Sequence, residues 1–223
     1  MEQFKGIGVS RGVAVGEAFV IESERMPVRP RQIPKDQAEA EVQRYERAVA
    51  TAIEGIRDDQ RRLAPKLGGE YLAIFETHIR MLDDRRLCDD IIDRIRTGHV
   101  AAEAAADEVL RKYITLLLED QSTARWVPDI YDVQNRLHRV LLGRQSRDVR
   151  QLEKPVAIIA EDLMPSQMVG FDRDKVLAIT MEKGGVTSHT AIIANALGIP
   201  AVVGLGGLTA GVQIGRASCR ERV

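Results

Sequence analysis

Long apolar runs, a strong excess of one charge and closely spaced cysteines are all absent from the 223-residue sequence. Apolar stretches such as PVAIIA fall far below the roughly 20 residues that a membrane-spanning helix needs, and the start, MEQFKGIGVS, lacks a signal-peptide core. A formal net charge of -1 gives no support to binding of nucleic acid or anionic membranes. Cys88 and Cys219 have neither CxxC nor Cys/His ligand spacing. We expect a cytoplasmic protein without a disulfide framework or a metal site.

The apolar pattern changes twice along the chain and predicts two structural domains. Residues 1–24 are glycine-rich and β-like, while residues 146–213 alternate strands (KPVAIIA, KVLAIT, PAVVG) with short helices (MPSQMVG, TSHTAIIANALG). That order is typical of an α/β layer with parallel strands. Residues 34–143 instead have the three- and four-residue apolar spacing of helices. We therefore predict a discontinuous α/β domain, 1–24 with 146–213, interrupted by an antiparallel α-helical domain over 34–143.

Four helices are expected within the helical domain. The first ends near Pro65, the second runs from Leu72 to Gly98, the third is AAEAAADEVLRKYITLLL, and the fourth begins after Pro128. An apolar seam along the first helix is formed by Val42, Tyr45, Val49, Ile53, Ile56 and Leu63. His78, His99 and His138 also fall in this domain, and we interpret them as surface or seam residues.

The last ten residues, IGRASCRERV, do not resemble the closing strands of an α/β domain. Their codons can be written as an in-frame translation of a common sequencing adapter. We therefore expect residues 214–223 to be a non-native tail that replaces the natural continuation of the protein. Genomic resequencing across this junction is the test.

The stretch GGVTSHTAIIANALGIP, residues 184–200, places a histidine at the start of a short apolar helix. The glycine pair permits a sharp turn, and Thr187 or Ser188 can cap the helix. His189 then lies in the first turn, where exposed amides and the helix dipole attract an anion and favour a neutral ring. Ser188 and His189 are not a hydrolase pair, because neighbours on a helix point about 100° apart. We predict that His189 accepts a phosphoryl group, in an environment formed by Gly184, Gly185, Thr187, Ser188 and Thr190.

The string GGVTSHTAIIANALGIPAVVG resembles the phosphohistidine signature of the phosphoenolpyruvate-utilising enzymes. Four further segments resemble the amino-terminal region of the Enzyme I branch of this family. They are GVSRGVAVGEAFV near the start of the chain, and AIFETHIRMLDD, AADEV and DVQNRLHRVLLG in the helical domain. The resemblance implies a phosphotransferase in which His189 takes a phosphoryl group from phosphoenolpyruvate and passes it to the phosphocarrier HPr. HPr would dock on the helical domain. Phosphoenolpyruvate and Mg²⁺ would bind a further domain outside these residues, and this fragment would hold no cofactor.

An acidic and apolar group of side chains on the helical domain is the candidate docking surface. Basic residues surround the histidine of HPr-like partners, so an acidic rim would steer and seat them. An ordinary solvated face is the competing interpretation, and three neighbouring arginines weaken the acidic character. The candidate partner-binding residues are Glu70, Phe75, Met81, Leu82, Asp83 and Asp84.

Three positions depart from the family pattern. Val186 and Asn195 stand where many relatives carry arginine, and Met168 stands where relatives carry a threonine near the active histidine. A nitrogen-related paralogue is therefore one alternative interpretation of the chain. Two others are a non-catalytic docking protein and the swivelling phosphohistidine domain of a dikinase or synthase. The resemblance further implies a monomeric fragment and a homodimeric intact enzyme.

Overall fold

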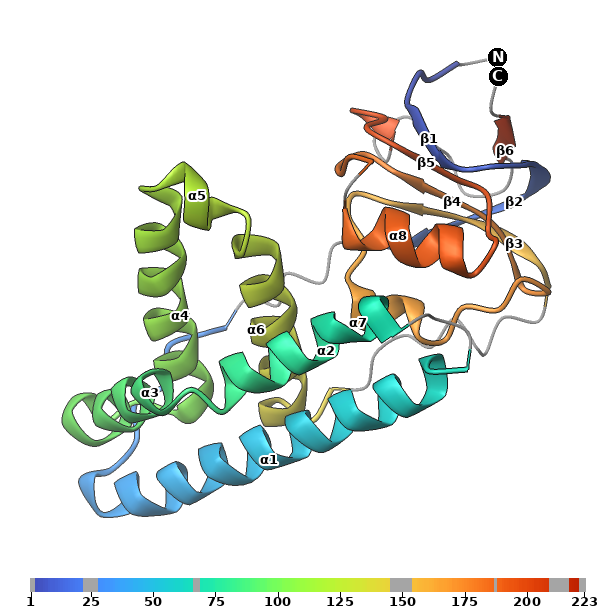
Figure 1. Cartoon of the computed structure of the whole chain (residues 1–223). Helices are drawn as coiled ribbons and strands as arrows, with labels where there is room; N and C mark the ends of the chain where they lie inside the picture. Colours follow the sequence, from blue (N-terminus) through green and yellow to red (C-terminus); the bar gives the residue numbers. More distant parts are fainter. Residues whose placement is uncertain are drawn as a thin grey trace. The chain divides into compact units, whose positions relative to one another are not determined.

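A computed structural model describes residues 3–21, 28–65, 69–144, 154–186, 188–208 and 217–220, without the side chains of 69–71 and 217–220. The chain divides into two compact units (Figure 1). The α/β unit comprises Met1–Glu24, Arg62–Leu72 and Arg147–Val223, and the helical unit comprises Arg25–Arg61 and Ala73–Ser146. Residues 62–72, which the sequence assigns to the helical domain, are thus grouped with the sheet. Within the described ranges, no helix has both the length and the apolar character to cross a membrane.

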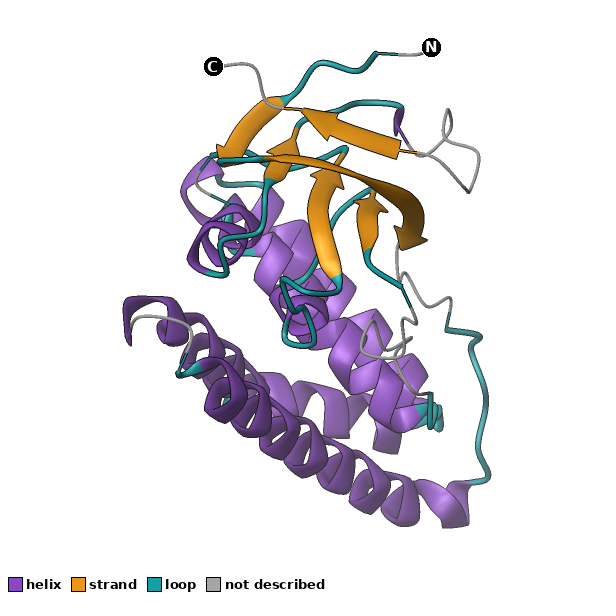
Figure 2. Cartoon of the chain, turned by 90° about the vertical axis from the view of Figure 1, so that its right-hand side faces the viewer, coloured by secondary structure: helices purple, strands orange, loops and turns teal. Residues whose placement is uncertain are grey.

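A six-stranded mixed sheet forms the α/β unit, and its strands are drawn in orange in Figure 2. The strand order is β1-β5-β4-β3-β2-β6. Four neighbouring strands, β5, β4, β3 and β2, run parallel, while β1 and β6 pair antiparallel at the edges. The amino-terminal segment lies inside the sheet because β2 pairs with β3 from Glu17–Val156 to Ile21–Ala160. The strands are β1 Ile7–Ser10, β2 Val13–Ile21, β3 Val156–Ala160, β4 Val176–Met181, β5 Ala201–Val203 and β6 Ala217–Arg220.

Strand β6 falls within residues 214–223, the segment that the sequence predicts to be non-native. It pairs antiparallel with Val13–Gly16 of β2. Strand pairing through the backbone depends little on side-chain identity, so it does not reveal the origin of this segment. The non-native tail stays a prediction.

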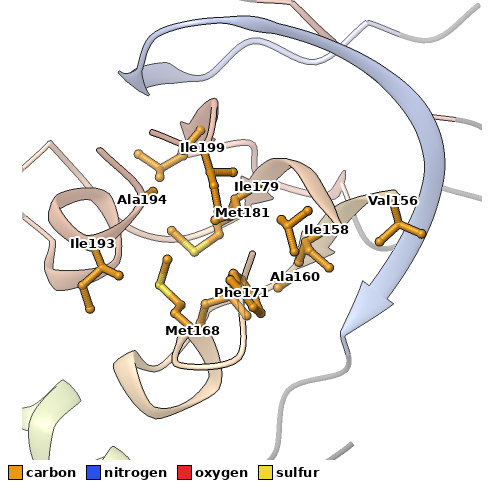
Figure 3. Close-up of a cluster of buried hydrophobic side chains, with 14 residues drawn as sticks. Val156, Ile158, Ala160, Met168, Phe171, Ile179, Met181, Ile193, Ala194 and Ile199 are labelled. Carbon is orange, nitrogen blue, oxygen red and sulfur yellow. The ribbon is translucent and has the colours of Figure 1, made fainter. Parts of the chain in front are cut away.

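Strand β3 is buried along its whole length because both of its faces are covered. Val156, Ile158 and Ala160 belong to the main apolar cluster of the unit (Figure 3). Ile159 belongs to a separate cluster with Ala18. Alternate residues of a strand point to opposite faces, which explains the continuous apolar run PVAIIA. Two short helices, α7 (Pro165–Met168) and α8 (His189–Ala196), complete the main cluster with Met168, Ile193 and Ala194.

The helical unit differs from the predicted four helices because Asp84 starts a new one. Its backbone is extended, and its carboxylate accepts from the Leu87 N–H at 2.8 Å, which separates α2 from α3. A short α5 also begins where Asp120 accepts from the Ser122 N–H. The helices are α1 Ala38–Leu63, α2 Gly69–Leu82, α3 Arg85–Gly98, α4 Ala102–Leu118, α5 Gln121–Ala124 and α6 Val127–Leu141, preceded by a 3-10 turn at Lys35–Gln37.

Arg44 joins three helices of the helical unit through half-buried polar contacts. Its guanidinium donates to Glu103 in α4 at 2.8 Å and to the Leu141 carbonyl at the end of α6 at 2.7 Å, and it pairs with Glu41 on its own helix. Glu41 also accepts from the Ala102 N–H at 2.8 Å, which caps α4 where Ala101 cannot. Burial opposes ionisation of Glu103, but the backbone and Arg44 outweigh it and hold the pKa of Glu103 below its ordinary value.

We expect Arg44→Ala to lower the free energy of unfolding by about 1 to 3 kcal/mol, because the Leu141 carbonyl loses its guanidinium donor and two carboxylates each lose one of their donors. Arg57→Ala, on the same helix, is the matched control: its pair with Glu54 is exposed, so the change should cost less than about 0.5 kcal/mol. Urea unfolding followed by far-ultraviolet circular dichroism measures both. Equal costs for the two variants would contradict the account of this contact.

Two histidines are buried between helices of this unit, and the third ends a helix. His78 Nε2 lies 3.2 Å from Asp129 and its Nδ1 lies 3.6 Å from Asp132. His138 is 1% exposed, and burial lowers its pKa although the carboxylates of Asp107 and Glu103 oppose the shift. His99 closes α3 in the left-handed conformation, with φ of 49°. His78 and His138 therefore lie at the predicted seams.

Buried His138 should make the helical unit less stable in mild acid. In the unfolded chain this histidine binds a proton as pH falls through its ordinary pKa of 6.5, whereas the folded protein resists that proton. Unfolding is therefore favoured below that pH. We expect the loss of stability between about pH 7 and pH 5 to be smaller in His138→Leu than in the unsubstituted chain. Urea unfolding at several pH values tests this, and parallel pH profiles would refute it.

Candidate functional site

The turn before α8 depends on a glycine. Gly184 follows β4 with φ of 103°, a conformation that other residues rarely adopt. A Cβ there would lie at ordinary contact distance from Met181 Cε (3.5 Å) and Ser188 Oγ (3.6 Å), so the backbone conformation is what requires glycine. Gly185 has no such constraint, and its carbonyl accepts from the Ser188 N–H at 3.0 Å. Thr187, a predicted member of the site, lies outside the described residues.

Ser188 is the residue that caps α8. Its backbone is extended, and its hydroxyl oxygen accepts from the Ala191 N–H at 3.2 Å, so one amide of the first turn is satisfied. His189 follows as the first residue of the helix and is exposed. Gly198, with φ of 65°, closes the other end. The histidine thus lies at the positive end of the helix dipole and is open to solvent, as the sequence predicts.

Thr190 occupies a different position from the one expected for a phosphate ligand. Its side chain is 4% exposed, and its hydroxyl donates to the Leu163 carbonyl at 2.7 Å. This hydrogen bond connects the first turn of α8 to the segment between β3 and α7. The structure therefore gives the Thr190 hydroxyl a partner within the protein, and its predicted place in a phosphate environment gains no support.

Charged residues gather at the carboxyl ends of β3 and β4, the sheet edge from which the turn to α8 leaves. Lys183 Nζ lies 2.6 Å from Glu161, and the Lys183 N–H donates to the Glu161 carbonyl at 2.9 Å. Burial raises the pKa of Asp162, although the Leu163 N–H and Lys183 partly offset it. This group was not predicted from the sequence. Its only sequence signal is that Glu161 and Asp162 directly follow a buried strand.

The three departures from the family pattern have different environments. Met168 is completely buried and packs in the cluster that contains Ile193 of α8 (Figure 3). Val186 is 64% exposed in the turn before the helix, and Asn195 is exposed near its end. The side chain at position 168 therefore contributes apolar packing to the cluster that contains Ile193 of α8. Val186 gives the turn an apolar surface where an arginine would bring positive charge.

Two of the residues predicted to bind a partner are buried. Phe75 and Leu82 are 1% and 2% exposed, because the apolar face of α2 packs into the core, so neither can contact a partner. Met81 is half-buried, and Asp83 and Asp84 are exposed, although Asp84 already caps α3. The side chain of Glu70 lies outside the described residues. The sequence pattern identified an apolar face but could not show that it faces inward.

Exposed apolar side chains of the helical unit occur instead near the end of α4 and the start of α6. Leu116 and Leu118 are largely exposed, and the Trp126 ring is partly exposed with the Arg125 guanidinium 5.3 Å from its centre. The sequence prediction of a docking surface did not include these residues. The run TLLL could have revealed them, since three consecutive leucines on a helix cannot all face one core.

We expect Ser188→Ala to destabilise the first turn of α8 by about 1 kcal/mol, because the Ala191 N–H loses its acceptor. Amide hydrogen exchange within α8 should become about fivefold faster, while exchange in β3 should not change. Ser188→Thr retains the hydroxyl and is the control. If Ser188→Ala left exchange in α8 unchanged, the cap would not stabilise the helix.

Two family models match the chain. The model for the N-terminal part of PEP-utilising enzymes matches residues 5–122, and the model for their mobile domain matches residues 152–217. A phosphoenolpyruvate-protein phosphotransferase of Haemophilus influenzae is 35% identical, over 94% of this chain and 37% of its own length. The Bacillus subtilis protein of the same name is 34% identical, over 96% and 38%. The chain therefore spans less than two fifths of these relatives.

Solved structures give the same relationship. A solution structure of Enzyme I (nEIt) superposes with a TM-score of 0.74 at 33% identity, and the match covers 96% of this chain and 87% of that one. The N-terminal domain of Enzyme 1 - Nitrogen superposes with a TM-score of 0.62 at 22% identity, which shows likeness of fold alone. By its family models, its relatives and its fold, the chain belongs to the phosphoenolpyruvate-utilising enzymes.

Proposed function

We propose that this chain is the part of a phosphoenolpyruvate-protein phosphotransferase that carries a phosphoryl group on His189 and exchanges it with a phosphocarrier protein of the HPr type. One observation carries the proposal: His189 is exposed and is the first residue of a capped helix. The amino end of a helix attracts phosphate through its dipole and its amides. Relatives named for this activity and matching nearly the whole chain support the proposal.

The chemistry requires only a nucleophilic nitrogen and an anion-binding surface. A lone pair on a ring nitrogen of His189 attacks the phosphorus of the donor, and a new N–P bond forms. When the donor is a phosphohistidine, its N–P bond breaks and the electron pair returns to that imidazole. The partial positive charge at the amino end of α8 would stabilise negative charge on the oxygens of the phosphoryl group during transfer. No redox partner is needed, and reversal passes the group to the carrier.

Phosphoenolpyruvate and Mg²⁺ are proposed to act outside the residues described. In the complete enzyme the metal would neutralise charge on the phosphoryl donor. Among the described residues, no group of three or more His, Cys, Asp or Glu side chains is arranged to hold a metal ion. We also propose that the complete enzyme works in the cytoplasm as a homodimer that associates outside this part.

The helical unit is proposed to dock the carrier. Its exposed Leu116, Leu118 and Trp126 provide apolar area of the kind that forms the centre of an interface, with an aromatic anchor. Exposed Asp83 can attract the basic residues of the carrier. Phe75 and Leu82 stabilise α2 from the core.

We expect the chain to take up phosphate from ³²P-labelled phospho-HPr as an acid-labile, base-stable adduct, because phosphoramidates hydrolyse in acid. His189→Ala should abolish labelling, since the nucleophile is gone. His99→Asn is the matched control: asparagine tolerates the left-handed conformation at position 99, so labelling should persist.

A wild-type chain that remains unlabelled would refute the proposal. Binding of HPr without exchange of phosphate would instead identify a docking protein in which His189 is vestigial. Label that persists in His189→Ala would assign the acceptor to another residue.

A further inference from the structure

The buried hydroxyl of Thr190 makes a polar contact that connects the first turn of α8 to the segment between β3 and α7. Thr190 follows His189 directly, and its side chain points into the α/β unit, where its hydroxyl donates to the Leu163 carbonyl at 2.7 Å. The Ser188 cap differs, because its partner, the Ala191 N–H, belongs to the same helix. The cap stabilises the helix but does not fix the helix against its surroundings.

The acceptor of this hydrogen bond is itself held firmly. Leu163 is 2% exposed, and its N–H donates to the Asp162 carboxylate at 2.9 Å. The next residue, Met164, donates its N–H to Gln167 of α7 at 2.7 Å. The Leu163 carbonyl is therefore part of a rigid corner between β3 and α7. A hydrogen bond to a fixed acceptor restrains the donor in both distance and direction.

The direction of His189 follows from the direction of Thr190. Neighbouring helix residues project about 100° apart, so a buried Thr190 turns His189 toward solvent. Ile193 and Ala194 of α8 also pack against an apolar cluster that includes Met168. Apolar packing is non-directional and methionine is adaptable, so these contacts allow rotation of a short helix about its axis. The Thr190 hydrogen bond removes that freedom at the first turn.

We propose that Thr190 is a positioning residue: by donating to Leu163, its hydroxyl fixes the rotation of the first turn of α8 and so aims the His189 imidazole at the phosphoryl donor. This inference rests on the proposed role of His189. Small errors in the placement of a reacting group reduce rates strongly, because productive geometry is narrow. Thr190 therefore acts on the rate of phosphoryl transfer and leaves binding of the carrier unchanged.

The test compares three single variants of the full chain. Thr190→Val keeps the shape and removes the hydroxyl, and Thr190→Ser keeps the hydroxyl. Thr180→Val is the matched control, because the Thr180 hydroxyl donates to the Ile158 carbonyl at 2.9 Å in the same unit, between β4 and β3. Transfer from phospho-HPr is measured in single turnovers over a range of carrier concentrations. Nitrogen-15 relaxation of the His189 ring, without any carrier, is the second measurement.

Thr190→Val should slow transfer about 10- to 100-fold, with the half-saturating carrier concentration unchanged within about twofold. Thr190→Ser should restore most of the rate, and Thr180→Val should behave like the unsubstituted chain. Ring mobility of His189 should rise in Thr190→Val alone. The inference would be overturned if Thr190→Val transferred phosphate at the wild-type rate, or if Thr180→Val slowed transfer as much as Thr190→Val. If the unsubstituted chain accepts no phosphate, the proposed function fails, while ring mobility still decides whether Thr190 orients His189.

Discussion

The start of helix α8 is the constraint on which the proposed function of this chain depends. Gly184 adopts a backbone conformation that other residues avoid, Ser188 caps the first turn, and His189 is thereby both the first helical residue and exposed to solvent. A histidine later in the helix would lose the positive end of the dipole, and one on the inward face would lose contact with a donor. Local backbone geometry therefore sets the chemistry of the site.

The sheet supplies the rigid frame for that geometry. Parallel pairing of β2, β3, β4 and β5 places the carboxyl ends of β3 and β4 together, and the turn to α8 leaves from this edge. The corner after β3 provides the Leu163 carbonyl, and the buried Met168 packs beneath the helix. The amino-terminal β2 is an interior strand of the same sheet, so residues far apart in sequence jointly support the site.

Local signals predicted the start of α8 better than they predicted the surface of the helical unit. A glycine turn, a hydroxyl cap and a first helical turn depend on interactions within a few residues, so the position of His189 in the first turn followed from the sequence, which offered Thr187 or Ser188 as the cap. Whether a side chain is buried depends on distant segments. Phe75 and Leu82 therefore seemed suitable for a partner but face the core, and the Thr190 bond to Leu163 spans residues that no local pattern connects. Asp84 broke the predicted second helix because a cap signal outweighed continuous apolar spacing.

The central claim is tested most directly by nuclear magnetic resonance. The chain is labelled with ¹⁵N-histidine, and its spectrum is recorded after exposure to the phosphorylated carrier. The account predicts that one ring nitrogen of His189 acquires coupling to phosphorus while the signals of His78, His99 and His138 show none. Coupling at any of those three rings, or at no histidine, would contradict it.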